Sequence, residues 1–288
     1  MIYISTGGFQ NKTSFQASEE LLRVGCTSIE LSAGLHSDSL FADLKALAHK
    51  ARFQIHNYFP PPKVPIVLNL ASRDSVIATL TIEHIKKAIQ WSAELGQSTY
   101  SFHAGFLIDP KVEELGRKVE PRALSNRNDA LSIFIERVNA IDDYAVAHGV
   151  KILIENNVLS AGNFINFKSN PFLMTGAEEC IDVMKHTSDN VELLVDVAHL
   201  KVSAKSLGFD PVDFLAACES WIRAYHLSDN DGTRDSNDPI RDDSWFWPYI
   251  KTNLDYYSLE VYGISPSGLS LQRELAATKL EYKLNETS

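Results

Sequence analysis

Side chains that bind metal ions occupy corresponding places at the ends of six short apolar runs. These residues are His56, His103, Glu155, Asp196, His226 and Glu260. Each follows a bulky apolar or aromatic residue, and side chains alternate between the two faces of a strand. If the bulky residues pack outward, the six polar side chains point inward together. Carboxylates and imidazoles are suitable ligands for divalent ions, so the pattern predicts a site for Zn²⁺, Mn²⁺, Co²⁺ or Mg²⁺ that holds one ion or two.

Each of these residues taken alone has an ordinary structural explanation. A single histidine at a strand end is more often a hydrogen-bonded core residue than a ligand, and a single aspartate is more often a helix cap. Six residues at matching positions favour the metal site. A bound cation would also offset the cost of burying the carboxylate of Glu155, which follows the apolar residues of "VKILIENN" (150–157).

The elements that must position these residues are eight short apolar runs separated by segments with helical spacing. The runs are residues 2–6, 28–33, 53–59, 99–106, 150–157, 191–200, 222–230 and 257–263. The clearest helical segments are 75–96 and 128–149, with Asn128 expected to cap the second. Strands that alternate with helices imply a parallel α/β sheet. Eight units in 288 residues suit one closed (β/α)8 TIM barrel domain over residues 1–288. An open doubly wound sheet is the alternative, although the Gly-rich loop of its nucleotide-binding members is missing.

Three connections between these elements are long, at residues 60–73, 107–124 and 158–174. Long loops in a compact domain are often functional. All three follow strands, and the active sites of (β/α)8 barrels lie at that face. We therefore expect the loops to surround the site.

Further polar residues lie just after the sixth and seventh runs. His199 follows Asp196 by three positions, so it joins the site only if the chain turns after Asp196. The loop after the seventh run is rich in aspartates, most of which we expect to be solvated, and it contains Arg234, Asp235 and Arg241. His199 and these loop residues are candidates for a second metal site or for binding substrate oxygens, as are His56 and His103.

Composition narrows the range of partners and compartments. The formal net charge of −10 disfavours nucleic-acid binding, which usually needs a basic surface. The sequence has no run of about 18 apolar residues, so it does not predict a membrane span. The start "MIYISTGGFQ" lacks the basic flank of a secretory signal. Three scattered cysteines fit a reducing compartment, so we expect a cytoplasmic protein. Whether it forms a homo-oligomer stays open.

Five ordered motifs resemble those of the xylose-isomerase-like superfamily of TIM barrels, which includes sugar-phosphate isomerases and epimerases and the endonuclease IV family of abasic-site nucleases. The motifs are "FHAG" (102–105), "IEN" (154–156), "DVAH" (196–199), "YHLSDND" (225–231) and "LEVYG" (259–263). Similarity to the epimerase members implies one divalent metal ion held by Glu155, Asp196, His226 and Glu260. It also implies that the two glutamates are an acid/base pair on opposite faces of a bound sugar.

Similarity to the nuclease members implies more metal ions. His56, His103 and Glu155 match one zinc site, and Glu155 bridges to a second site made with the other three strand-end residues. A third site would need His199 and an Asp-x-His pair. Here that pair reads "DSN" (235–237), with asparagine in place of histidine. Because an amide is a poor substitute for imidazole at zinc, the third site is in doubt.

Three functions are compatible with these residues. The leading one is a metal-dependent isomerase or epimerase that acts on a small-molecule sugar or sugar derivative, by proton transfer alpha to a carbonyl between two glutamates. The second is an endonuclease IV-like metal-dependent phosphodiesterase or abasic-site nuclease. The third, a non-catalytic sugar-binding relative, is disfavoured because the ligand residues are intact. The number of metal ions per chain discriminates between the first two functions.

Overall fold

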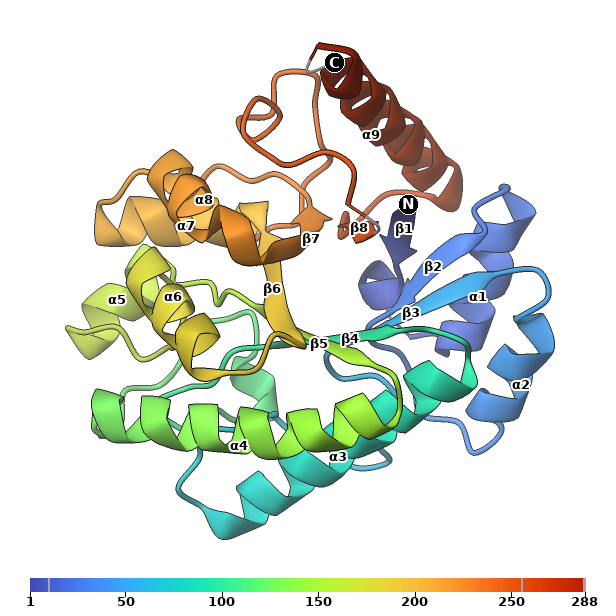
Figure 1. Cartoon of the computed structure of the whole chain (residues 1–288). Coiled ribbons are helices and arrows are strands. Elements are labelled where there is room, and N and C mark those ends of the chain that lie inside the picture. Colours follow the sequence, from blue (N-terminus) through green and yellow to red (C-terminus); the bar gives the residue numbers. More distant parts are fainter. Residues whose placement is uncertain (10, 255, 287–288) are drawn as a thin grey trace.

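The computed structural model describes residues 1–9, 11–254 and 256–286 (Figure 1). The strands are β1 (Ile2–Ser5), β2 (Ser28–Leu31), β3 (Arg52–His56), β4 (Thr99–His103), β5 (Lys151–Glu155), β6 (Val191–Asp196), β7 (Ile222–Leu227) and β8 (Tyr256–Leu259). The helices are α1 (Ser14–Arg23), α2 (Leu40–Leu47), α3 (Ser75–Glu94), α4 (Arg127–Ala147), α5 (Ala161–Phe167), α6 (Ala177–His186), α7 (Val197–Leu207), α8 (Pro211–Cys218) and α9 (Pro266–Glu286). The short 3-10 helices are η1 (Thr6–Gly8), η2 (Val112–Glu114) and η3 (Glu219–Trp221). At least one helix follows each strand except β7, because the described residues between β7 and β8 contain no α-helix. Each predicted run coincides with one strand, although the strands are shorter than the runs.

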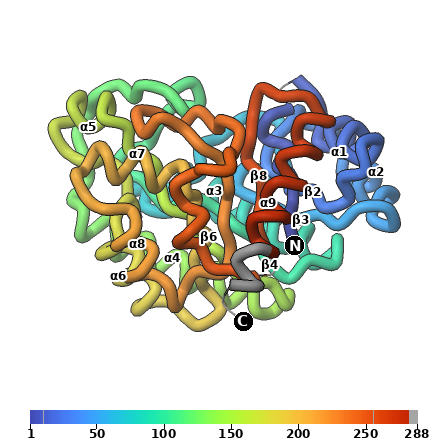
Figure 2. The backbone as a smooth tube through the Cα atoms, turned by 90° about the horizontal axis from the view of Figure 1, so that it is seen from above, coloured from blue at the N-terminus to red at the C-terminus, as the bar shows by residue number. Residues whose placement is uncertain are grey.

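The eight strands form a closed parallel barrel in the order β1 to β8. The barrel closes where β1 pairs with β8, with Tyr3 opposite Ser258. This closure confirms the predicted (β/α)8 barrel and excludes the open doubly wound sheet. The last helix, α9, packs against β1 and β8, so the first and last elements of the chain meet at the seam (Figure 2). No helix in the described part of the chain has both the length and the apolar character needed to cross a bilayer.

Two apolar layers place the strand ends at the barrel mouth. Bulky residues that precede the strand-end polar groups, such as Ile154 and Val195, belong to the large core between the strands and the helices. The inner layer, below the strand ends, consists of Tyr3, Leu153, Leu194, Ala224 and Tyr256. Because the barrel is filled from inside and covered from outside, the polar side chains at the carboxyl ends of the strands are left to gather at its mouth.

One predicted strand is too long. The apolar run 191–200 does not continue as a strand, because β6 ends at Asp196 and α7 begins at the next residue. The Asp196 carboxylate accepts hydrogen bonds of 2.7 Å from the backbone N–H groups of Ala198 and His199. These bonds satisfy two of the donors that a helix leaves free at its start. The change from strand to helix therefore has a local cause.

The three long connections follow strands as predicted, and two of them have structure of their own. Loop 107–124 contains η2, and loop 158–174 contains α5. The helix after the first of these, α4, is capped by Asn126 and not by the predicted Asn128. The Asn126 side chain accepts a hydrogen bond from the backbone N–H of Asp129.

Candidate metal centre

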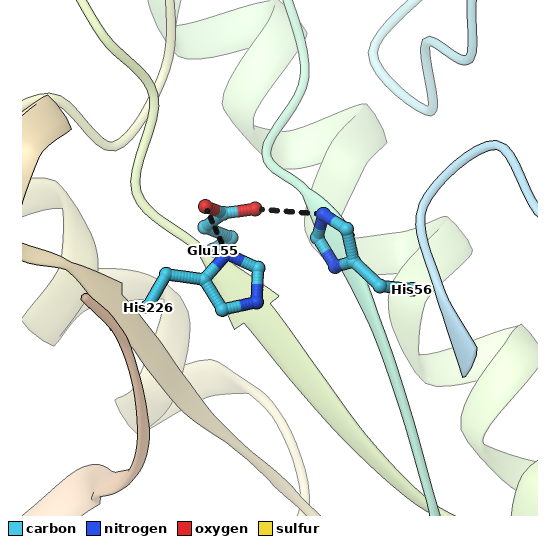
Figure 3. A group of neighbouring side chains, drawn as sticks. All are labelled: His56, Glu155 and His226. Carbon is cyan, nitrogen blue, oxygen red and sulfur yellow. Dashed lines mark ion pairs between the residues drawn. The ribbon is translucent and has the colours of Figure 1, made fainter. Parts of the chain in front are cut away.

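Glu155 lies at the centre of the polar groups at the barrel mouth (Figure 3). Its Oε2 atom lies 3.3 Å from both His56 Nε2 and His103 Nδ1. Its Oε1 atom lies 3.2 Å from His226 Nδ1 and 3.5 Å from His199 Nδ1. The carboxylate is completely buried, so its surroundings are four imidazole rings rather than water.

Three overlapping groups of side chains have ligand atoms within 4.8 Å of one another, close enough to share an ion. The groups are His56, Glu155 and His226; His103, Glu155 and His199; and Glu155, Asp196, His226 and Glu260. The last group joins the ends of four consecutive strands and is the set that similarity to the epimerases implies. His56 and His103 both face Oε2 of Glu155, the carboxylate that the nuclease-like prediction gives them. However, each also shares a group with another histidine, His56 with His226 and His103 with His199. Glu155 belongs to all three groups.

Several buried atoms of this cluster lack a hydrogen bond. Within the described residues, both carboxylate oxygens of Glu155, Oδ2 of Asp196 and Nδ1 of His226 are buried and make none. Nδ1 of His226 lies 3.0 Å from Glu260 Oε2, but this contact is not a hydrogen bond either. Buried polar atoms normally have hydrogen-bond partners, and one cation would satisfy these atoms together. The residues present therefore fit a divalent metal ion.

The protonation states of the cluster result from a competition between burial and charge. Burial raises the pKa of Glu155, but the neighbouring imidazoles, His103 foremost, outweigh burial and hold this pKa well below its usual range. Burial lowers the pKa of His103 to about 4, which leaves its ring neutral. Burial raises the pKa of Asp196 to about 7. Burial also acts to lower the pKa of His226, but the carboxylates of Glu30 and Glu155 raise it well above its ordinary value. A metal ion at His226 would therefore have to displace a proton.

His199 reaches the centre because α7 begins directly after β6. The predicted turn after Asp196 is the first turn of a helix, and it buries the imidazole to 4% exposure. His199 Nδ1 lies 3.0 Å from the carbonyl oxygen of Asn156, and Nε2 lies 3.2 Å from Asp235 Oδ2. The structure thus brings together His199 of α7 and Asp235 of the loop after β7, two residues that the sequence marks as candidates.

The other candidate residues in the loop after β7 differ in whether they reach the pocket beside the centre. Arg234 lines the pocket beside the centre. Arg241 instead forms a largely exposed ion pair with Asp243 at 3.2 Å, and it does not line that pocket. Asn237 has a φ of 48°, a left-handed conformation in which asparagine is enriched, and its carbonyl accepts a 2.9 Å hydrogen bond from the Tyr262 N–H. Asparagine at this position thus suits the backbone.

Three contacts at the centre come from residues outside the predicted set. His226 Nε2 lies 2.9 Å from Oε2 of Glu30, a completely buried residue of β2. The hydroxyl of Tyr256 donates a hydrogen bond to the same oxygen. The hydroxyl of Tyr262 donates to Glu260 Oε1 at 2.5 Å. The only sequence signal for Glu30 is an acidic residue flanked by apolar residues inside a buried strand.

A pocket of about 640 Å³ opens beside the centre. His103, His199 and Asp235 are among its lining residues, which connects the pocket with the candidate metal ligands. Loops 107–124 and 158–174 supply most of the remaining lining, as predicted. Loop 60–73 does not line this pocket.

Comparison with known proteins identifies relatives by fold. No curated protein matches the sequence. The solved structure of a D-tagatose 3-epimerase-like protein is similar, with 20% identity, a TM-score of 0.75 and coverage of 100% of this chain and 99% of that chain. A Thermus thermophilus protein soaked with ZnCl2 has 21% identity, a TM-score of 0.64 and coverage of 96% and 98%. D-psicose 3-epimerase with D-tagatose, from Clostridium cellulolyticum, has 15% identity, a TM-score of 0.65 and coverage of 98% and 97%.

The family follows from the sequence match together with the fold. The model of the xylose isomerase-like TIM barrel family matches residues 19–262. This range contains strands β2 to β8, which together with β1 form a closed parallel barrel, the fold that the family name describes. The chain therefore belongs to the family of xylose isomerase-like TIM barrels.

Proposed function

We propose that this protein is a metal-dependent isomerase or epimerase that acts on a sugar or sugar derivative. The observation that carries the proposal is the gathering of Glu155, Asp196, His226 and Glu260, with ligand atoms within 4.8 Å of one another, beside a large pocket. Similar structures include a D-tagatose 3-epimerase-like protein and a D-psicose 3-epimerase with D-tagatose, which supports a sugar as the substrate. Another comes from a protein soaked with ZnCl2, in line with a divalent ion.

The proposed mechanism divides the work between the ion and two glutamates. The four gathered residues would hold the ion, which supplies Lewis-acid polarisation of a carbonyl oxygen when bound. Of Glu155 and Glu260, one removes the proton alpha to the carbonyl and the other returns a proton, to the opposite face in an epimerisation. General acid–base steps of this kind contribute roughly 10²–10⁴-fold to the rate. The hydrogen bond from Tyr262 to Glu260 Oε1 orients this carboxylate, because Oε2 then faces His226.

The residues that line the pocket beside the ligands would bind substrate oxygens. Burial acts to lower the pKa of His199, but the carboxylates of Asp196 and Asp235 raise it well above its ordinary value. The ring is therefore charged, and its Nε2–H, which faces Asp235 at 3.2 Å, would have to turn from that carboxylate to donate to a hydroxyl or carbonyl oxygen of the substrate. Arg234 lines the same pocket and is a second donor.

A second candidate function is a metal-dependent phosphodiesterase of the endonuclease IV type. The observation that favours it is the membership of Glu155 in three overlapping groups, as expected for a centre with more than one ion. The net charge of −10 opposes binding to a phosphate backbone. Asn237 stands where the third zinc of a nuclease would need histidine.

A paired assay tests the order of these two functions. We expect the metal-loaded protein in D₂O to introduce deuterium beside the carbonyl of at least one sugar from a panel of aldoses and ketoses, as measured by NMR. We expect no efficient nicking of a DNA duplex with an abasic site when Zn²⁺ or Mn²⁺ is supplied. One ion per chain by elemental analysis would support the isomerase or epimerase. Nicking that depends on Glu155, without sugar exchange, would reverse the order.

The metal assignment predicts the effect of changing Asp196. Asp196→Ala should lose the metal ion while the barrel still folds, at a cost of roughly 0.5–2 kcal/mol for the lost cap of α7. Asp196→Asn should also weaken metal binding, because it removes the charge but keeps an oxygen for the helix donors. Asp210 caps α8 in a similar way, so Asp210→Ala is a control that loses a cap but no metal. Metal content in Asp196→Ala equal to that of the wild type would contradict the assignment.

A further inference from the structure

The pocket beside the metal centre is larger and more apolar than a free sugar requires. Its volume of about 640 Å³ lies within the range of roughly 300–1,000 Å³ for pockets that enclose drug-sized ligands, and a monosaccharide is much smaller than such ligands. The apolar side chains of its wall include Phe106, Leu115, Val119, Val158, Ile165 and Phe172. Hydroxyl groups buried against these side chains would lose their hydrogen bonds with water and gain none in return.

Most polar side chains of this wall already have partners within the protein. Asn157 donates to three backbone carbonyls at 3.0 Å. Asn163 accepts a 3.0 Å hydrogen bond from the Val119 N–H, and Asn166 donates to the Val119 carbonyl at 2.6 Å. Glu114 accepts from two backbone N–H groups. The bonds of Asn163 and Asn166 join loop 107–124 to α5, so the wall is formed in advance, and it offers few free groups to a polyol.

Ile165 shows that part of the wall lacks cover. Its side chain lines the pocket from α5 and is 73% exposed, although covering an isoleucine from water is favourable. An apolar ligand in the pocket would cover it. Exposed Arg117, Lys118 and Arg234 also line the pocket, so an anionic ligand is the alternative that the experiment must separate.

We propose that the substrate is a sugar that carries an apolar substituent, namely a keto-glycoside, whose ring bears the carbonyl that the proton transfer requires and whose anomeric carbon carries an aromatic or alkyl aglycone. A plain glycoside lacks that carbonyl, so it serves below as a probe of binding. The wall of loop 107–124 and α5 binds the aglycone while the sugar reaches the metal centre through His103 and His199. This inference rests on the proposed function, because it takes a sugar to be the group at the centre. It adds that a free monosaccharide fills only part of the site.

Binding measurements on the metal-loaded full chain test the inference. Calorimetry compares methyl, n-hexyl and p-nitrophenyl glycosides within the D-glucose, D-galactose and D-mannose series. In at least one series we expect the hexyl and p-nitrophenyl glycosides to bind about tenfold more tightly than the methyl glycoside. Ile165→Ser should reduce this ratio severalfold and still fold, because the side chain is exposed. Leu271→Ser is the matched control, since Leu271 is 65% exposed on α9 and does not line the pocket.

Either of two kinds of result would overturn the inference, a failed aglycone test or a preference for an anion. One is equal binding of methyl and p-nitrophenyl glycosides in every series, or a ratio that Ile165→Ser leaves unchanged. The other is tighter binding of a sugar 6-phosphate than of any p-nitrophenyl glycoside, which would assign the wall to an anion held by Arg117 and Lys118. Failure of the proposed function is a separate observation, namely no deuterium exchange with any free sugar or keto-glycoside, whatever the binding ratio.

Discussion

Glu155→Gln is expected to abolish deuterium exchange into the sugar, with a loss of at least about 10²–10⁴-fold in rate. Glutamine has nearly the same size as glutamate, but it cannot take up the substrate proton. The substitution also removes the negative charge of a carboxylate that belongs to all three ligand groups. Metal affinity should therefore fall as well. Glu260→Gln should also lose exchange, because glutamine at this position cannot take up or return a proton. The hydrogen bond from Tyr262 can persist in this variant.

Glu192→Gln is the matched control for these variants. Glu192 is a mostly buried residue of the neighbouring strand β6, and it is paired with Lys151 at 3.2 Å and with Arg223 at 2.7 Å, outside the metal centre. Its variant should keep the metal ion and the exchange activity. Exchange rates by NMR and metal content by elemental analysis are measured on all the variants. Wild-type exchange by Glu155→Gln, or an equal loss in Glu192→Gln, would show that Glu155 is not an acid/base group.

Glu30→Gln is expected to weaken metal affinity by about 10–100-fold, although Glu30 is not one of the candidate ligands. Its carboxylate faces Nε2 of His226 at 2.9 Å, which places the proton on that nitrogen and directs Nδ1 toward Glu155 and Glu260. Glutamine can still accept this hydrogen bond, but it lacks the charge that makes the imidazole a stronger ligand. The barrel should therefore fold while the ligand is weakened.

Two further variants separate this positioning role from simple packing. Tyr256→Phe removes the other hydrogen bond to Glu30 and keeps the carboxylate, so metal affinity should change little. Glu30→Ala leaves a buried imidazole and a buried hydroxyl without their acceptor, which should lower stability by about 3–5 kcal/mol. The ¹⁵N shifts of the His226 ring report its tautomer directly. A Glu30→Gln variant that binds metal as tightly as the wild type and leaves those shifts unchanged would contradict the proposed positioning of His226 by Glu30.

Much of this fold is readable from the sequence because its signals are local. A buried parallel strand is a short continuous apolar run, and eight such runs alternating with helical segments predict the barrel. The residue that ends each run has a defined face, because side chains alternate along a strand. That rule predicts that His56, Glu155 and Asp196 point into the same interior, and the structure places them in two overlapping groups that share Glu155. The roles of these residues as ligands and acid/base groups remain predictions.

The ends of strands and helices and the conformations of loops are harder to predict from the sequence, because they depend on hydrogen bonds that composition does not reveal. The aspartate of "DVAHL" is a possible helix cap, but the apolar residues around it continue the pattern of a buried strand, so the sequence does not tell where β6 changes to α7. The change depends on the Asp196 carboxylate capping the helix, and it carries His199 into the site. In the loop after β7, Arg234 and Arg241 look equivalent in sequence. Only the folded loop turns the first to the pocket and pairs the second with Asp243 at the surface.

The sequence by itself determined the eight strands, the helical segments between them and the polar strand ends, since these follow from the periodicity of single segments. Tertiary structure alone decided which polar groups touch across the barrel. Glu30 and His226 are 196 positions apart, and β2 and β7 are not neighbours in the sheet. Their contact exists only because the barrel closes and directs both side chains into the same interior, and no local pattern records a closure that depends on all eight strands.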